Sequence, residues 1–167
     1  PFIRLPWGVD GEVFNYRLPG KRWKVLTTGY CGRGEAIVEC WLAAERANSK
    51  AIHIGGEIPD AATSVLRKED VSDAELATLY CESEFVSGLR WGEGFELPVL
   101  EGLCCGARPI CFDTPGYRYW FNDHAIFVPE VFGGNLVDIL ARIFSEPPAP
   151  VTVAERDKVL ERFSWKT

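Results

Sequence analysis

Residues 85–106 read FVSGLRWGEGFELPVLEGLCCG, and this order predicts a strand, a loop and a helix. Phe85 to Ser87 form a short apolar run, as in buried strands. Gly88 to Leu97 form the loop, and Pro98 stands at the first helical position, where proline is favoured. The helix is expected to end at Gly106, because glycine readily takes the left-handed conformation that follows a helix.

Similar apolar runs recur along the chain, and helical patterns separate them. Glycine, proline or aspartate ends each run, as expected for parallel strands covered on both faces. The other runs are Val25–Thr28, Ala51–Ile54, Ile110–Phe112 and Ile126–Val128, with Val65–Leu66 as a weaker sixth strand. Apolar positions at helical spacing mark residues 35–47 and 136–143, and Ser72 and Thr152, each with Glu three residues later, start two more helices. This alternation predicts an α/β fold, a Rossmann-like parallel sheet of about six strands with helices on both faces.

Composition limits the possible partners. With 167 residues, 47% hydrophobic and 25% charged, the chain is long enough for one folded domain. A net charge of -6 argues against binding to nucleic acid or to an anionic membrane. No apolar run approaches the roughly 20 residues of a transmembrane helix, so we expect no membrane contact and a soluble, cytoplasmic protein. The absence of Met and the start at Pro1 indicate a piece of a longer chain.

The six cysteines are interpreted as small buried hydrophobic residues in a reducing cytoplasm. They lie within apolar runs, and none has the C-x-x-C spacing that, with a second pair, marks a zinc site. The sequence therefore predicts neither a metal nor a disulfide framework.

Two carboxylates of the opening stretch are candidate ligand-binding groups. Parallel sheets bind ligands at the carboxyl ends of their strands, and Glu93 on the loop and Glu101 in the first helical turn are both expected at that mouth. A glycine-bearing loop leading into a helix suits phosphate, whereas carboxylates accept hydrogen bonds from hydroxyls. A sugar nucleotide has both chemistries. The alternative is that Glu101 only stabilises the helix dipole and that Glu93 is solvated.

At this point the sequence resembles the C-terminal donor-binding domain of GT-B glycosyltransferases of retaining family 4. That family carries E-G-F-G-L-P-x-L-E-A-M-A-x-G-x-P-V-V, and residues 93–110 read EGFELPVLEGLCCGARPI. Further segments are similar to family motifs in the same order. They are PWGVDGEVF at 6–14 (interdomain segment), IGG at 54–56, VSDAEL at 71–76 and FSW at 163–165 (start of the last helix).

The resemblance implies a division of the chain and a reaction. Residues 1–20 would be an interdomain linker, 21–163 the donor-binding domain, and 164–167 the start of a truncated crossover helix. The domain would bind a UDP- or GDP-sugar for retaining transfer to an acceptor held by a missing N-terminal domain. It would need no metal or other cofactor. This fragment alone would be inactive.

The resemblance also implies roles for individual residues. Glu101 would contact the ribose, and Glu93, with Arg33 at the diphosphate, would be catalytic. The remaining donor-binding candidates are Gly94, Phe95, Glu96, Leu97, Pro98, Gly29, Tyr30, Gly55 and Arg67. Arg67 would lie beside the edge of the nucleotide base. The alternative is that residues 67–69 are a run of charged side chains in solvent.

Several positions depart from the family pattern. The family's first strand continues into G-R-x-x-x-x-K-G, but here Tyr30 stands at the arginine and Arg33 at the lysine. Glu96 replaces a glycine, and its charge would oppose a diphosphate if it pointed inward. Two alternatives therefore stay open: a non-catalytic nucleotide-sugar-binding or scaffold domain, and a GT-B sugar-nucleotide epimerase.

The remaining polar and aromatic candidates are better explained by structure than by function. His53 is expected in the core and His124 in a turn. Tyr117, Tyr119 and Trp120 are expected to pack in the core or between domains.

Overall fold

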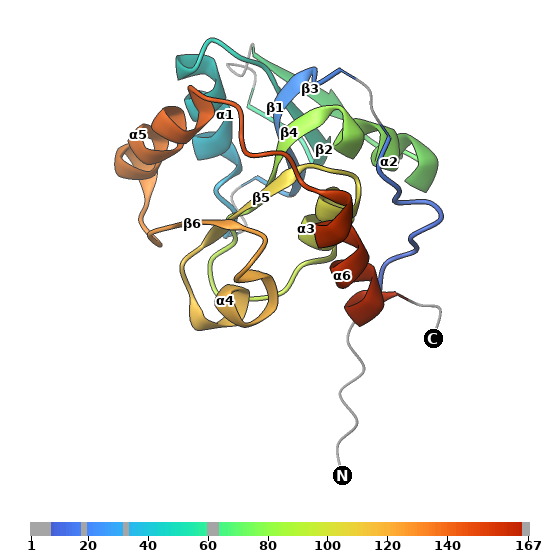
Figure 1. Cartoon of the computed structure of the whole chain (residues 1–167). Coiled ribbons are helices and arrows are strands. Elements are labelled where there is room, and N and C mark those ends of the chain that lie inside the picture. The colour runs from blue at the N-terminus through green and yellow to red at the C-terminus, as the bar shows by residue number, and fades with distance from the viewer. Residues whose placement is uncertain (1–7, 18–19, 32–33, 60–63, 165–167) are drawn as a thin grey trace.

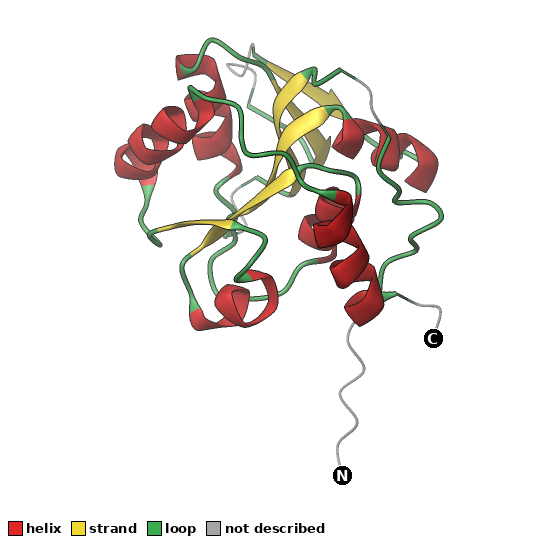
Figure 2. Ribbon diagram, viewed as in Figure 1, coloured by secondary structure: helices red, strands yellow, loops and turns green. Residues whose placement is uncertain are grey.

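The computed structural model describes residues 8–17, 20–31, 34–59 and 64–164, and it contains a six-stranded parallel sheet (Figures 1 and 2). The strand order is β3-β2-β1-β4-β5-β6, and every neighbouring pair is parallel. The strands are β1 (Trp23–Gly29), β2 (Ala51–Gly55), β3 (Val65–Lys68), β4 (Ser83–Gly88), β5 (Arg108–Phe112) and β6 (Ile126–Val128). The predicted fold is confirmed, including the weak sixth strand at Val65.

Helices cover both faces of this sheet. They are α1 (Ile37–Arg46), α2 (Asp73–Cys81), α3 (Leu97–Cys104), α4 (Pro115–Phe121), α5 (Gly133–Phe144) and α6 (Val153–Phe163). Helices α1 and α5 pack together on one face, and α3 packs with α2 and α6 on the other (Figure 1). The central strands β1, β4 and β5 are mostly buried, β5 along its whole length, whereas the edge strand β3 (VLRK) has no buried residue. No helix among the described residues is long and apolar enough to cross a membrane.

The helix starts follow the capping residues seen in the sequence. Thr152 forms a complete capping box with Glu155. Ser72 accepts a hydrogen bond from the Glu75 N–H, but the Glu75 carboxylate pairs with Lys68 instead of closing a box. Thr114 caps α4, a helix that the sequence reasoning did not predict. Its signal was present, because Thr114 is followed by proline at the start of the helix.

Helix α3 begins one residue earlier than expected. Leu97 is its first residue, so Pro98 occupies the second position. Gly106, with φ of 86°, follows the helix as predicted, and the Ala107 N–H donates to the Gly102 carbonyl at 2.8 Å. This is the Schellman arrangement, in which the left-handed residue satisfies the last carbonyls. The early start places Glu101 in the second turn rather than the first.

The two ends of the described chain lie side by side. The Val9 N–H donates to the Phe163 carbonyl at 2.8 Å, and Val9 pairs with Ser164 in a parallel bridge. Ser164 has extended backbone after α6. The predicted crossover helix falls mostly at 165–167, outside the described residues. It stays a prediction, as does the division into linker and domain.

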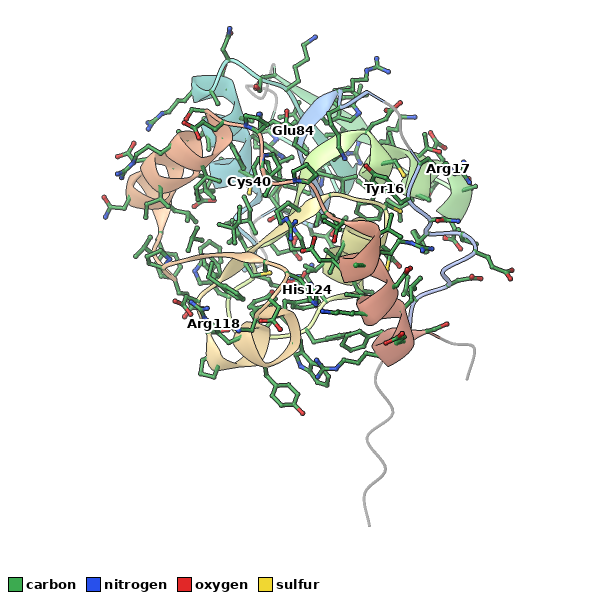
Figure 3. All side chains as sticks on the ribbon, viewed as in Figure 1. Tyr16, Arg17, Cys40, Glu84, Arg118 and His124 are labelled. Atoms are coloured by element: carbon green, nitrogen blue, oxygen red, sulfur yellow. The ribbon has the colours of Figure 1, made fainter. Side chains whose placement is uncertain are left out.

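The cysteines and histidines lie largely as expected. Five cysteines are buried and Cys31 is half-buried, all as free thiols. His53 is fully buried in β2, where its Nδ1 lies 3.0 Å from the Thr27 hydroxyl. His124 follows α4 in a turn beside α6, with its Nδ1 4.0 Å from the Glu155 carboxylate (Figure 3).

One guanidinium fastens the C-terminal part of the chain to the sheet. Arg108 in β5 is only 8% exposed, and it donates to the carbonyls of His124, Ala149 and Pro150 and to the Glu155 carboxylate. Burial alone would raise the pKa of Glu155, but hydrogen bonds from Arg108 and the Thr152 cap lower it to about 2. This lowered pKa stabilises the fold above about pH 4.5, and the contribution is lost as the pH falls toward 2.

We expect Arg108→Met to lower the free energy of unfolding by about 2–4 kcal/mol at pH 7, because it removes the cation from a partly buried carboxylate. Urea denaturation monitored by circular dichroism measures the change. The matched control is Arg46→Met, which breaks an exposed ion pair with Asp138 and should cost less than about 1 kcal/mol. Equal losses in the two variants would contradict the role given to Arg108.

Candidate functional site

The candidate site lies where β1 and β4 end, because the loops that follow these two central strands pair with each other. The Ala36 N–H donates to the Leu89 carbonyl at 2.9 Å, and the Trp91 N–H donates to the Gly34 carbonyl at 2.8 Å. Glu35 and Arg90 face each other in an antiparallel bridge between these contacts. The pairing also explains why α1 begins at Ile37 and not at residue 35.

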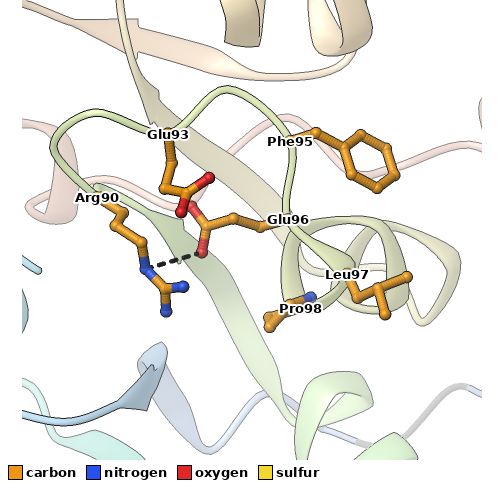
Figure 4. A pocket seen from close by; sticks show the side chains of 6 residues that line it. All are labelled: Arg90, Glu93, Phe95, Glu96, Leu97 and Pro98. Carbon is orange, nitrogen blue, oxygen red and sulfur yellow. Dashed lines mark ion pairs between the residues drawn. The ribbon is translucent and has the colours of Figure 1, made fainter. Parts of the chain in front are cut away.

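A hollow of about 340 Å³ opens beside this pairing (Figure 4). Its lining comes from the loop after β4 and from the start of α3: Arg90, Glu93, Phe95, Glu96, Leu97 and Pro98. Glu93 is exposed at this hollow, as expected for a group that meets a ligand. Glu101 is not among the residues that line this hollow, and its predicted place at the same mouth as Glu93 stays a prediction.

Glu96 points inward and is only 7% exposed. The Tyr117 hydroxyl donates to its carboxylate, and Arg90 Nε lies 3.6 Å from its other oxygen (Figure 4). Burial raises the pKa of Glu96, although Tyr117 and Arg90 act in the opposite direction. Tyr117 was expected only to pack. It is fully buried, and it also holds the residue that replaces the family glycine.

Gly94 and Phe95 fix the loop to α4. A Cβ on Gly94 would lie 2.7 Å from the Gly116 Cα, so the two backbones touch. The Phe95 ring stacks on Phe121 with centroids 5.9 Å apart and meets the edge of Trp120 at 5.3 Å. In this structure, therefore, the glycine gives close packing between two segments and the phenylalanine ring joins an aromatic cluster.

Glu101 lies on α3 against α2, and Tyr80 holds it. The Tyr80 hydroxyl donates to the Glu101 carboxylate at 3.3 Å. Burial raises the pKa of Glu101 to about 7, and the Tyr80 hydrogen bond only partly opposes this shift. Tyr80 is fully buried and was not identified from the sequence. Its only sequence signal was its place in an apolar helix face.

The turns after β1 and β2 touch through glycines. A Cβ on Gly55, which has φ of 141°, would overlap the Gly29 carbonyl, and the Gly56 N–H donates to that carbonyl at 3.0 Å. Arg67 Nε donates to the carbonyls of Gly55 and Gly56 at 3.1 and 2.7 Å. The Tyr30 ring lies over Gly56 and is 59% exposed. Arg67 thus supports the turn, and its predicted contact with a base stays a prediction.

The cation that the sequence assigned to a diphosphate, Arg33, lies outside the described residues. Arg90 is a cation of this region that the sequence reasoning missed. Its Nη2 is 2.5 Å from the Glu35 carboxylate, and it also faces Glu96. Within the described part of the chain, no group of three or more His, Cys, Asp or Glu side chains is placed to hold a metal ion.

Comparison with solved structures identifies the architecture, whereas no family model and no curated protein sequence matches the chain. The C-terminal domain of a glycosyl transferase group 1 family protein from Francisella tularensis superposes with a TM-score of 0.73 at 16% identity, covering 95% of this chain and 100% of that one. The fold is that of a GT-B C-terminal domain. Sucrose-phosphate synthase from Thermosynechococcus elongatus (TM-score 0.71, 18% identity) is covered over 48% of its length and this chain over 96%.

The likeness extends to structures of longer chains. HepE from Anabaena, solved in complex with UDP, matches with a TM-score of 0.68 at 12% identity over 94% of this chain and 52% of its own. The chain therefore spans about half the length of several structures that it resembles. The Francisella neighbour is a glycosyl transferase group 1 family protein, and the likeness to it supports the resemblance seen in the sequence at the level of the fold.

We expect Glu101→Gln to make the protein more stable at pH 8. A carboxyl whose pKa is raised from 4.5 to about 7 favours folding at low pH, and this stabilisation is lost as the pH rises through that window. The neutral amide avoids the loss, so the variant should exceed the unchanged chain by about 1–3 kcal/mol at pH 8 and match it near pH 4.5.

Urea denaturation at both pH values measures this difference. The control is Glu93→Gln, which removes the same charge from an exposed loop position and should leave stability unchanged at both. A Glu101→Gln protein that is less stable at pH 8 would show that the carboxylate gains more from Tyr80 than it loses by burial.

Proposed function

We propose that this chain is the donor-binding domain of a retaining family 4 glycosyltransferase and that it binds a nucleoside diphosphate sugar, with UDP or GDP as the nucleotide. Support comes from the GT-B fold, from the order of the sequence motifs and from the glycine turns at the ends of β1 and β2. The free thiols are in keeping with a reducing cytoplasm.

The observation that carries this proposal is the environment of Glu101. An acid that merely stabilises a helix dipole gains most in the first turn and stays in water. Glu101 lies in the second turn, and burial raises the pKa of its carboxyl to about 7. A half-buried carboxylate that accepts one hydrogen bond from a tyrosine costs stability and retains further acceptor positions. Those positions suit the two hydroxyls of a ribose.

In the proposed donor site, Glu93, Arg33 and the backbone N–H groups of the loops would bind the parts of the donor beyond the ribose. Glu93 faces the hollow at the loop, where the transferred sugar would lie. As the glycosidic bond breaks, the leaving diphosphate gains negative charge, and fixed donors aimed at it lower the barrier. Arg33 and the backbone N–H groups of the loops would supply these donors without a metal. The acceptor would be presented by an N-terminal domain of the same protein.

A non-catalytic nucleotide-sugar-binding or scaffold domain is the second candidate, and one observation favours it. Two carboxylates, Glu35 and Glu96, lie on Arg90 near the ends of β1 and β4. That arrangement opposes the negative charge that must be stabilised during transfer. Binding of donor without turnover in the complete two-domain protein would decide for this alternative.

Glu101→Ala is expected to weaken binding of the nucleoside diphosphate by about 1.5–3 kcal/mol, the range for a hydrogen bond to a charged group. Glu93→Ala should leave the nucleoside diphosphate nearly unaffected and weaken only the sugar-bearing donor. Calorimetric titration of both variants with UDP, GDP and their sugar conjugates measures the effects. Equal losses for the bare nucleotide would contradict this division of roles.

The 167-residue chain alone is expected to bind donor and to transfer nothing. Transfer needs the acceptor hydroxyl aligned with the anomeric carbon, and this alignment supplies several kcal/mol of the barrier lowering. Titration with UDP and GDP should show binding, while assays for sugar transfer and donor hydrolysis show no turnover. Transfer by the purified chain would place the acceptor site within it, and the two-domain proposal would be abandoned.

A further inference from the structure

A carboxylate of the chain itself lies inside the turn that follows β1. Gly29 ends this strand with φ of 109°, and a Cβ there would overlap the Glu35 carboxylate. The Tyr30 N–H donates to Glu35 Oε2 at 3.2 Å. The missing side chain of the glycine therefore makes room for the acidic group, which takes a backbone donor of the turn.

The end of the first strand is where α/β folds of this kind place the phosphates of a nucleotide. Glycine lets the ligand approach the backbone there, and N–H groups at the following helix start bind the negative oxygens. Glu35 lies two residues before the start of α1, and its carboxylate presents two anionic oxygens to this turn. It thus takes a donor that a phosphate oxygen would otherwise take.

The same carboxylate also engages the nearby cation. Arg90 Nη2 lies 2.5 Å from Glu35 Oε1, and Arg90 Nε lies 3.6 Å from Glu96 Oε2. The backbone pairing of residues 34–36 with 89–91 holds these side chains together. Among the residues that the structure describes, Arg90 therefore faces two carboxylates, and exposed Glu93 adds a third negative group at the adjoining hollow.

We propose that Glu35 is a specificity-determining residue that competes with the diphosphate of the donor for the Tyr30 N–H and for Arg90. This inference rests on the proposed function and deepens it. While Glu35 holds its place, the nucleoside part of the ligand supplies most of the affinity and the diphosphate adds little. When Glu35 withdraws, Arg90 and the turn become available to the phosphate oxygens.

The test compares the unchanged chain with Glu35→Gln, which keeps the shape of the side chain and removes its charge. Both are titrated calorimetrically with uridine, uridine diphosphate, guanosine and guanosine diphosphate. Removing one negative charge a few ångströms from the phosphates should raise the affinity for the preferred diphosphate about tenfold or more. The affinity for the uncharged nucleoside should change less than about twofold, because it carries no charge to repel.

Three further variants separate this role from general effects on charge or folding. Glu45→Gln removes the same charge from α1 at an exposed position and should change either affinity less than about twofold. Glu35→Gln combined with Arg90→Gln should lose the gain, since the released cation is absent. Glu35→Asp draws the carboxylate back from the Tyr30 N–H and should raise the affinity for the diphosphate by less than Glu35→Gln does. If Glu35→Gln does not fold, the Glu35→Asp variant provides the test of competition.

The outcomes distinguish this inference from the proposed function. If the unchanged chain and the Glu35 variants bind the diphosphate equally well, Glu35 does not compete and this inference is wrong, while donor binding stands. If none of the chains binds any of the four ligands, donor binding is wrong and the inference falls with it.

Discussion

The site depends on the backbone pairing between the loop after β1 and the loop after β4. These strands are neighbours at the centre of the sheet, so their following loops emerge side by side. Hydrogen bonds from Ala36 to Leu89 and from Trp91 to Gly34 join them. The pairing fixes where α1 begins, brings Glu35 to Arg90 and sets the wall of the hollow that Glu93 faces. Either loop alone would lack a partner for its exposed backbone groups.

This pairing concentrates negative charge at a place where the fold ordinarily receives an anion. Burial raises the pKa values of Glu35 and Glu96, which shows that both carboxyls lose hydration. Arg90 offsets part of that cost for both, and the Tyr117 hydroxyl offsets more for Glu96. Removing the cation from such a pair lowers the stability of the fold, because it leaves a carboxylate that is shielded from water and has no opposite charge beside it. Arg90 is therefore needed by the unliganded structure as well as by the proposed ligand.

The sheet could be predicted from the sequence because short apolar runs bounded by Gly, Pro or Asp have few other interpretations. Helix α4 was missed because its seven residues are mostly aromatic and show no clear apolar stripe. The contacts of the candidate site were harder to predict from the sequence than the sheet. Glu101 was found from a motif, but Tyr80 and Tyr117 reach their carboxylates from other helices, a contact that spacing along the chain does not reveal. The Glu35–Arg90 pair joins residues 55 positions apart for the same reason, and Glu96 gave no signal of its inward direction.

The loop that carries Glu93 is held at its far end by the aromatic cluster around Phe95. That ring contacts Trp120 and Phe121 of α4 and also Phe163, the last residue of α6, with centroids 5.8 Å apart. Phe163 in turn accepts a hydrogen bond from Val9 near the other end of the described chain. Closely packed aromatic rings move together, because a gap of even half an ångström loses much of their contact energy. The aromatic cluster therefore links the loop that carries Glu93 to α4, to the end of α6 and, through Phe163, to the segment at Val9.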